Sequence, residues 1–245
     1  MIGGKSVLGV IPARAGSKGV PRKNARTLCG KPLLGWTIDA ARGAACLDRV
    51  VLSSDDDEIM DLGRSLGCEV PHRRPAHLAS DTAMVVDVVL NLLDTMRERF
   101  DFVVLLQPTS PLREARDIDG AAAACFAAGA PACASVVAAE QSPYLMYRLE
   151  AAGRMVPVLG EGTSSRRQDL PQIYALNGAV YVTESERLRA ERKFVGANAV
   201  GYEMPRERSI DIDSELDFAL AGLLLEARER APTKPAATPL TSRRQ

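Results

Sequence analysis

The sequence predicts a three-layer α/β fold of Rossmann-like type, with a mostly parallel sheet between two layers of helices. Short apolar runs of strand type alternate with stretches of helix length along most of the chain, the order typical of a parallel sheet. Residues 102–106 are apolar at every position, as expected of a central strand buried on both faces. A chain of 245 residues with 46% hydrophobic residues can bury one large core. We therefore expect one domain over residues 1–230.

The expected elements follow one another in βα order. Strands are expected at residues 7–11, 49–53, 68–70, 102–106, 134–137 and 179–182. Helices are expected at residues 31–43, 54–66, 80–99, 115–128 and 214–230. A proline lies in the first turn of the first helix, and the second and third begin with Ser, Asp and Thr residues that can cap them.

Two segments depart from this order. Residues 140–176 are rich in Pro, Gly, Arg and Gln and carry weak strand signals. A segment of this length is too long for a simple connecting loop in a compact domain, so we expect it to have a function of its own. Residues 231–245 are rich in Pro, Thr and Ala, and we expect this tail to be disordered.

The composition gives no support for a nucleic-acid or membrane partner, and it predicts a cytoplasmic location. Lys and Arg together number 31, as do Asp and Glu, so the overall charge gives no argument for nucleic acid. Residues 120–139 are uncharged, but Gly129 and Pro131 interrupt this alanine-rich stretch, so we expect no membrane span. Five cysteines without a C-x-x-C pair suit reduced thiols, which predicts a cytoplasmic protein.

The connection after the first strand has the composition of a phosphate-binding loop. It contains two glycines, Gly16 and Gly19, among cationic side chains that include Arg14, Lys18 and Lys23. Glycine lets backbone N–H groups face an anion, and the cations supply countercharge. Neither the dinucleotide fingerprint nor the P-loop pattern is present, so we expect a nucleotide site of a third type. The alternative is a solvated basic loop.

Two further stretches have the residue types of a ligand site. Gln107 and Ser110 follow a central strand in a loop stiffened by prolines, at the sheet edge where α/β proteins bind ligands. Asp211 and Asp213 alternate with isoleucines, so an extended backbone places both carboxylates on one face. Two carboxylates suit Mg²⁺ together with a substrate phosphate. The alternative is that Asp213 or Ser214 only caps the last helix.

Arginines mark two more candidate positions. Arg166 and Arg167 are adjacent in a loop, where such pairs are usually solvated. One planar guanidinium could nevertheless bind a sugar-acid carboxylate in a bidentate manner.

The chain resembles the acylneuraminate cytidylyltransferases, also called CMP-sialic acid synthetases, over all but its tail. Five motifs in the family's order carry the resemblance: I-P-A-R-x-G-S-K-G with K-N at 11–24, R-P-x-x-L-A-x-D at 74–81, L-L-Q-P-T-S-P-L-R at 105–113, R-x-x-L-P with N-G-A-x-Y at 167–181, and S-I-D-I-D-x-E-x-D at 209–217. The resemblance implies a nucleotidyltransferase fold. It also implies transfer of CMP from CTP to the anomeric hydroxyl of a nine-carbon 2-keto-3-deoxy sugar acid (a nonulosonic acid), with release of pyrophosphate.

The resemblance also implies a role for each candidate residue. The nucleotide-binding residues are Arg14, Gly16, Ser17, Lys18, Asn24 and Arg74, the last at the cytosine. The sugar-binding residues are Gln107, Ser110, Arg167, Asn177 and Tyr181. The catalytic residues are Lys23, Asp211 and Asp213, and the two aspartates hold Mg²⁺ or Mn²⁺. Family members pair as homodimers through the region that matches 140–176, so a homodimer is expected.

One departure from the family leaves the acceptor open. Sialic acid enzymes place a lysine shortly after a proline in the sugar-binding segment, whereas residues 142–146 contain no cation. The S-P-Y-x-M and R-R-Q-D-L-P stretches also resemble the legionaminate-type members. The alternatives are a 3-deoxy-manno-octulosonate or other sugar nucleotidyltransferase, and a non-catalytic nucleotide-binding module. The general base is not assigned.

Overall fold

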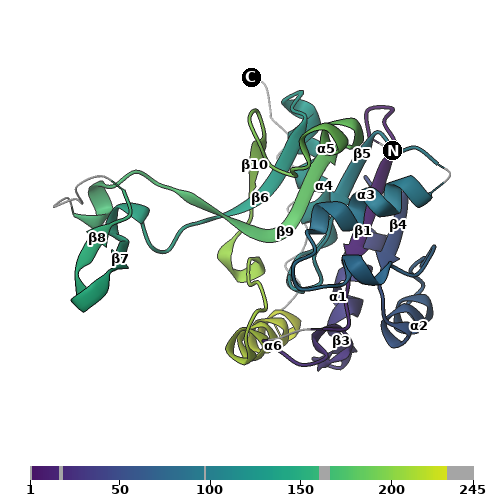
Figure 1. Ribbon diagram of the computed structural model, residues 1–245, viewed down its shortest axis with the longest axis horizontal. Coiled ribbons are helices and arrows are strands. Elements are labelled where there is room, and N and C mark those ends of the chain that lie inside the picture. The colour runs from purple at the N-terminus through teal and green to yellow at the C-terminus, as the bar shows by residue number, and fades with distance from the viewer. Residues whose placement is uncertain (1, 17–18, 97, 160–165, 231–245) are drawn as a thin grey trace, which may run out of the picture.

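A six-stranded sheet forms the centre of the molecule, with strand order β10-β6-β9-β5-β1-β4 (Figure 1). The computed structural model describes residues 2–16, 19–96, 98–159 and 166–230. The strands of this sheet are β1 (Val7–Pro12), β4 (Arg49–Ser53), β5 (Phe102–Leu105), β6 (Ala132–Ala138), β9 (Tyr174–Glu184) and β10 (Val200–Glu203). Strand β9 runs antiparallel to both β5 and β6, and the other neighbours are parallel. The predicted α/β fold with a mostly parallel sheet is confirmed.

Helices cover both faces of the sheet. On one face α1 (Leu33–Gly43), α2 (Asp57–Ser65) and α4 (Ala115–Ala127) pack against alternate strand residues such as Ile11 and Val104. On the other face α3 (Val85–Thr95) and α5 (Ser185–Glu191) pack against the intervening strand residues. The period-two alternation of a strand divides its apolar residues between the two layers.

The boundaries of several elements differ from the prediction. Residues 68–70 form only a single bridge, between Glu69 and Val51, rather than a strand. Helix α3 begins at Val85 after an uncapped Met84, so the run at 80–82 does not cap it. Helix α2 has the expected cap, since Asp56 accepts a hydrogen bond from the Ile59 amide. Helix α5 and strand β10 were not predicted.

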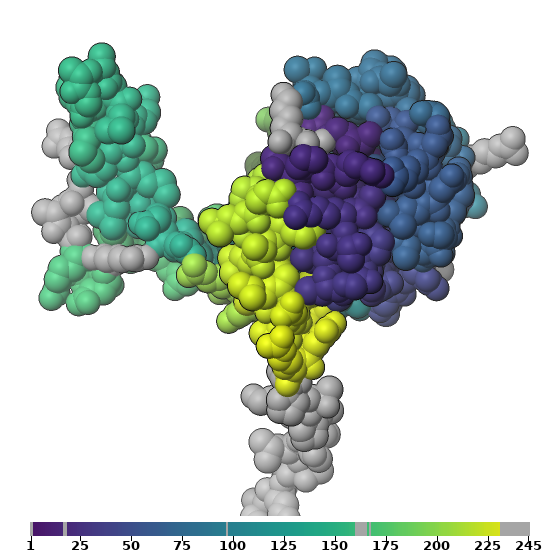
Figure 2. Space-filling model, turned by 90° about the horizontal axis from the view of Figure 1, so that it is seen from below, coloured from purple at the N-terminus to yellow at the C-terminus, as the bar shows by residue number. Residues whose placement is uncertain are grey.

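The last helix packs against the N-terminal part of the chain. Helix α6 (Glu215–Arg230) buries Phe218, Ala221 and Leu225 against Val20, Leu28 and other residues of the first connection. In Figure 2 this yellow helix lies directly against the purple N-terminal part. The first connection itself contains the small hairpin of β2 (Thr27–Leu28) and β3 (Lys31–Pro32), and the 3-10 turn η1 (Lys23–Ala25). This packing places the segment before α6 beside the predicted phosphate loop.

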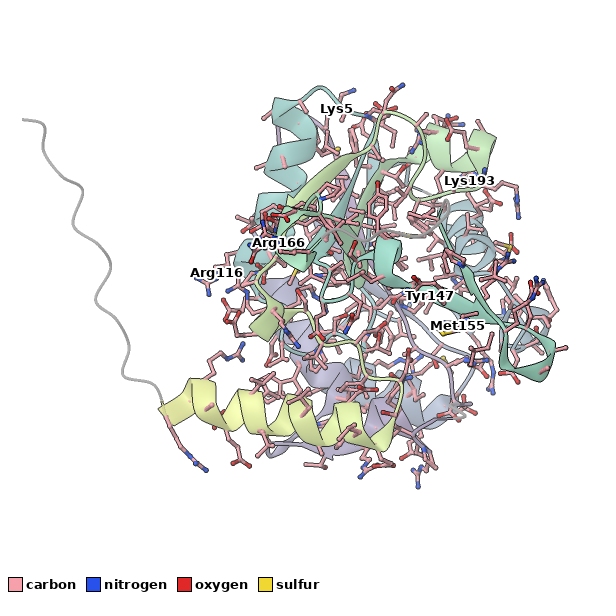
Figure 3. The ribbon with its side chains drawn as sticks, turned by 90° about the vertical axis from the view of Figure 1, so that its left-hand side faces the viewer. Lys5, Arg116, Tyr147, Met155, Arg166 and Lys193 are labelled. Atoms are coloured by element: carbon pink, nitrogen blue, oxygen red, sulfur yellow. The ribbon has the colours of Figure 1, made fainter. Side chains whose placement is uncertain are left out.

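The chain between β6 and β9 forms an arm that projects away from the sheet (Figures 1 and 2). It carries the hairpin of β7 (Tyr147–Leu149) and β8 (Met155–Pro157), in which Leu149 pairs with Met155. Figure 3 labels Tyr147 and Met155 on this hairpin. Large apolar side chains of the arm are exposed, including Leu149 at 75% and Met155 at 58%. The short 3-10 turns η3 (Pro143–Leu145), η4 (Ala151–Gly153) and η5 (Arg167–Asp169) complete the arm.

The remaining 3-10 turns are η2 (Ala76–Leu78) and η6 (Arg206–Arg208). All five cysteines are free thiols, and burial raises the pKa of Cys46 and Cys68 to about 12. Such thiols are poor nucleophiles at neutral pH. No helix in the described ranges is both long enough and apolar enough to cross a membrane. The tail predicted to be disordered, 231–245, lies outside the described residues.

Candidate active site

A cavity of about 330 Å³ lies where the parallel strands β1, β4 and β5 end. Because the carboxyl ends of parallel strands meet at one sheet edge, segments far apart in the sequence converge there. Its lining combines cations, carboxylates and a few apolar side chains. The lining residues are Pro12, Arg14, Gly16, Lys23, Asn24, Arg74, Leu78, Ser80, Asp81, Ala83, Val85, Val88, Gln107, Pro108, Thr109, Asp211 and Asp213. Eight of the predicted site residues therefore face one space.

Polar contacts fix the N-terminal wall of this cavity. The Asn24 amide donates to the carbonyl oxygen of Arg14 at 3.0 Å, and Arg14 Nη1 donates to Asp81 Oδ1 at 2.7 Å. A Cβ atom on Gly19 would lie 1.8 Å from the carbonyl oxygen of Asp213. Only glycine therefore permits this close approach of the loop to the segment that carries the two aspartates.

The backbone of Ile212 holds Asp211 and Asp213 in place. The Ile212 N–H donates to the carbonyl oxygen of Thr109 at 2.9 Å, and its own carbonyl oxygen accepts from Lys23 Nζ. Lys23 Nζ also lies 3.7 Å from Asp213 Oδ1. The Lys23 side chain is only 11% exposed, whereas that of Asp213 is 82% exposed. A nearly buried ammonium thus stands beside a carboxylate that remains open to the cavity.

The two aspartates differ in their surroundings. Burial raises the pKa of Asp211, and the nearby charge of Asp213 raises it further, while Thr109 and Lys23 act in the opposite direction. Asp211 Oδ1 is buried without a well-formed hydrogen bond to any described residue, although the Thr109 hydroxyl lies near this carboxylate and lowers its pKa. A carboxylate oxygen without a well-formed hydrogen bond is costly to bury, and a cation would remove that cost.

Helix capping does not account for Asp213. Ser214 Oγ and the Ser214 amide both donate to Asp217 Oδ2, at 2.7 and 2.8 Å, and the Asp217 amide donates back to Ser214 Oγ. This is a capping box in which Ser214 is the cap. Asp213 contributes only its backbone N–H, which donates to Asp217. The alternative in which Asp213 is the cap is wrong.

Arg74 forms part of the wall next to β4. Its side chain is 5% exposed, and its Nε donates to Ser53 Oγ at 3.1 Å while its Nη2 donates to the Ser53 carbonyl. Burial lowers the pKa of this guanidinium to about 10, so it remains charged at neutral pH. Hydrogen bonds to Ser53 fix its plane and leave it able to recognise a flat polar group in the cavity.

Gln107 and Asp211 face each other across Gly178. Gly178 has φ +75°, and a Cβ atom there would lie 3.2 Å from both Gln107 Oε1 and Asp211 Oδ2. Glycine at this position avoids backbone strain and leaves room between the two side chains. Ser110, in contrast, is fully buried and does not line the cavity.

Asn177 and Tyr181 also do not line the cavity. The Asn177 amide accepts from Ser135 Oγ at 2.6 Å and donates to Ser209 Oγ at 2.9 Å, so both of its ends are used within the protein. The Tyr181 ring packs on Phe194 with centroids 6.0 Å apart. In the single chain, Ser110, Asn177 and Tyr181 pack or bond within the protein and do not face the cavity. Their contact with a sugar stays a prediction without support from this geometry.

The structure does not describe the side chains of three predicted residues. Ser17 and Lys18 lie outside the described residues, as does the side chain of Arg167. The neighbouring Arg166 is exposed and pairs with Asp169 at 2.9 Å, as expected of a solvated arginine.

The sequence reading missed several lining residues. Asp81 and Ser80 were interpreted as helix caps, but both line the cavity. Thr109, inside the Gln107 loop, was not singled out although it contacts Ile212. Asp81 is the last residue of the R-P-x-x-L-A-x-D stretch at 74–81, and that position was the available signal for it.

Comparisons with known proteins give consistent results. A family model described as cytidylyltransferase matches residues 8–220. Over 237 residues the chain is 35% identical to the CMP-N,N'-diacetyllegionaminic acid synthase of Legionella pneumophila, covering 92% of this chain and 98% of that protein. It is 34% identical over 211 residues to an N-acylneuraminate cytidylyltransferase of Streptococcus agalactiae, covering 85% of this chain and 51% of that protein. This chain thus spans about half the length of the streptococcal relative. The solved structure of a CMP:2-keto-3-deoxy-manno-octonic acid synthetase complexed with CTP superposes with a TM-score of 0.71 at 15% identity, covering 91% of this chain and 99% of that one.

Proposed function

The chain belongs to the cytidylyltransferase family, and we propose that it transfers CMP from CTP to the anomeric hydroxyl of a nonulosonic acid, releasing pyrophosphate. One observation carries this proposal. Cations from the N-terminal loop, the buried Arg74, Gln107 and two aspartates converge on a single cavity at the carboxyl edge of the sheet. The cations of the N-terminal loop suit a triphosphate. Arg74 suits a base, Gln107 suits an acceptor sugar, and the two aspartates suit a divalent cation.

The nucleotide half of the site consists of the residues nearest the N-terminal loop. We propose that Arg14 and Lys23 contact the phosphates of CTP, together with Gly16, Ser17 and Lys18. Asn24 orders the loop through its bond to the Arg14 carbonyl. Arg74 faces the cytosine, with its plane set by Ser53. Phosphoryl transfer depends mainly on positioning and on neutralising charge, which these residues supply.

We propose that Asp211 and Asp213 hold Mg²⁺ or Mn²⁺. The buried Asp211 oxygen without a well-formed hydrogen bond and the exposed Asp213 carboxylate fit a hard cation. No cluster of three or more potential metal-ligating side chains occurs in the described ranges. Two carboxylates therefore need substrate phosphate to complete the coordination, which is how proteins commonly hold Mg²⁺. Asp211 and Asp213 would hold the cation where its charge could offset that of the α-phosphate and of the leaving pyrophosphate.

The acceptor half consists of Gln107 and, in our proposal, Arg167. Gln107 lies next to Asp211 and can orient the sugar relative to the phosphate. Arg167 would bind the carboxylate next to the attacking hydroxyl. Relatives named for N,N'-diacetyllegionaminic acid and for N-acylneuraminate support an acceptor of nine carbons. Likeness to the octonic acid synthetase at 15% identity supports only the fold.

We propose that the chain works as a homodimer in the cytoplasm. The projecting arm exposes Leu149, Met155 and other apolar side chains that a second copy of the arm could cover. Free cysteines support a reducing compartment.

A pyrophosphate-release screen tests the function. All four nucleoside triphosphates are combined with N-acetylneuraminate, N,N'-diacetyllegionaminate and 3-deoxy-manno-octulosonate in the presence of Mg²⁺. Release only with CTP and a nine-carbon acid supports the proposal, with reactions lacking the enzyme as the blank. Preference for the octulosonate supports the alternative acceptor, and binding of CTP without release in any pair supports a non-catalytic module.

A further inference from the structure

Arg113 ties together two walls of the active-site cavity from inside the protein. The residue is only 2% exposed. Its Nη1 donates to the carbonyl oxygen of Gln107 at 3.1 Å and to that of Ala179 at 2.8 Å. Gln107 lines the cavity, and Ala179 follows Gly178, whose α-carbon faces both Gln107 and Asp211. One nitrogen atom thus fixes the spacing between the Gln107 loop and strand β9.

The charge of Arg113 is poorly compensated. Its Nε and Nη2 have no hydrogen-bond partner among the described residues. Asp117, whose negative charge acts on Arg113, already accepts hydrogen bonds from Nε and Nη2 of Arg208 at 2.9 and 2.8 Å. Burial accordingly lowers the pKa of Arg113 to about 9. A buried cation without a carboxylate of its own is costly, and two hydrogen bonds to carbonyl oxygens offset only part of that cost.

Arg113 lies behind the Gln107 loop and outside the cavity lining. Because Arg113 does not line the cavity, any effect that it has on a ligand must pass through the residues that it contacts. The loop from Gln107 to Arg113 contains two prolines and is closed by this side chain at its end. Loss of the contact to the Gln107 carbonyl would free the only glutamine that faces Asp211 in the described cavity.

We propose that Arg113 is a positioning residue for the acceptor sugar, acting by fixing Gln107 against Gly178 and Asp211. This inference rests on the proposed function. The nucleotide side of the cavity has its own supports, Asn24 and Ser53, which Arg113 does not touch. Arg113 therefore affects acceptor use and leaves CTP binding almost unchanged.

A double-mutant cycle between Arg113→Met and Gln107→Ala tests this inference. Arg113→Met should lower kcat/KM for the sugar acid by about 10- to 100-fold, the size of effect that misplacing a substrate contact produces. The Kd for CTP, measured by calorimetry without acceptor, should change less than about threefold. In the Gln107→Ala background Arg113→Met should cost less than about threefold more, because residues that act through one another are not additive. Arg113→Lys, which keeps one donor and the charge, should recover part of the loss.

Arg187→Met is the matched control. Arg187 has a side chain only 8% exposed and a buried Nη1 without a described partner, but it lies on α5, away from the cavity lining. Its replacement should lower stability without changing kcat/KM per folded molecule. Additive losses in the cycle, or equal losses in CTP Kd and acceptor kcat/KM, would overturn the role of Arg113. If Arg113→Met does not fold, the cycle is measured with Arg113→Lys, and additivity there has the same meaning. Wild-type enzyme inactive with every CTP and sugar-acid pair would instead overturn the proposed function.

Discussion

Arg14 and Asp81 form an ion pair at 2.7 Å inside the candidate active site, although 67 residues separate them in the chain. Arg14 is one of the cations proposed to bind the phosphates of CTP. The carboxylate of Asp81 therefore occupies one of the donors that a phosphate oxygen would use. A ligand must compete with this contact before Arg14 can bind it fully.

Asp81→Asn should tighten CTP binding because it removes this competitor. An ion pair of this exposure contributes about 0.2–1 kcal/mol, so the Kd should fall by about 1.5- to 5-fold in calorimetry. Asp61→Asn is the matched control, since Asp61 pairs with Arg64 on the exposed surface of α2 at 2.8 Å. Weaker CTP binding by Asp81→Asn would show that Asp81 orients Arg14 toward the phosphates instead.

Asp213→Asn should abolish most activity and leave the fold intact. The change removes one charge from the proposed metal site, and we expect kcat to fall by about 10²–10³, as for loss of one preorganised electrostatic contact. Ser214→Ala should behave in the opposite way, because it breaks the capping box and costs about 0.5–2 kcal/mol of stability with little change in kcat. Near-normal turnover of Asp213→Asn would remove this carboxylate from the mechanism.

Asp211→Asn should stabilise the metal-free protein at neutral pH. The folded state raises the pKa of Asp211, so its ionised form is less stable there than in the unfolded chain. Removing the charge should raise Tm by roughly 1–8 °C, equivalent to about 0.5–2 kcal/mol. The gain should shrink as the pH falls through the pKa of Asp211, because the wild-type carboxyl then becomes neutral as well. Thermal melts without metal from pH 4 to 8 check this, with the exposed Asp213→Asn as control.

Leu149→Asp should convert a dimer into a monomer. Leu149 is 75% exposed on the arm, opposite Met155 in the hairpin, and a charge there cannot be buried against a second copy. Leu216→Asp is a fair comparison, because Leu216 is 77% exposed but lies on α6. Light scattering should report a monomer only for the arm variant. Dissociation by both variants, or by neither, would argue against pairing through the arm.

Arg167→Lys should impair use of the sugar acid but not of CTP. Losing a bidentate contact to a carboxylate costs on the order of 2–4 kcal/mol, or roughly 30- to 1,000-fold in kcat/KM. Arg166→Lys should cost almost nothing, because Arg166 pairs with Asp169 on the exposed surface. Steady-state kinetics with each substrate varied in turn distinguish the two arginines. A loss confined to CTP would assign Arg167 to the nucleotide.

The sequence was sufficient for those parts of the site that follow from strand order. The loop that contains Lys23 and the loop that contains Gln107 could be assigned to one edge because each follows a strand of recognisable type, whereas the role of Asp211 was implied by the family resemblance. Asp81 was misread because the local pattern of residues 80–82 fits a helix cap, whereas its partner, Arg14, is distant in the chain. The internal role of Asn177 was also invisible in the sequence, since only the structure reveals that Ser135 and Ser209 use both ends of its amide.

Long-range contacts also set features of the fold that the residue pattern does not specify, such as the direction of β9. An antiparallel strand has the same alternation as a parallel one, so the direction of β9 cannot be read from its residues. The burial of Arg113 likewise depends on the carbonyl groups of Gln107 and Ala179, which no local pattern specifies.

The hydrogen bond from Lys23 to the Ile212 carbonyl has a consequence for synthesis of the protein in the cell. Lys23 leaves the ribosome 189 residues before its partner. At about 5–20 residues per second, the interval is roughly 10–40 s. During that time the N-terminal loop has neither Ile212 nor the Asp213 carbonyl against which Gly19 packs. A nascent or prematurely terminated chain therefore lacks a finished nucleotide site, and only a nearly complete polypeptide can begin to consume CTP.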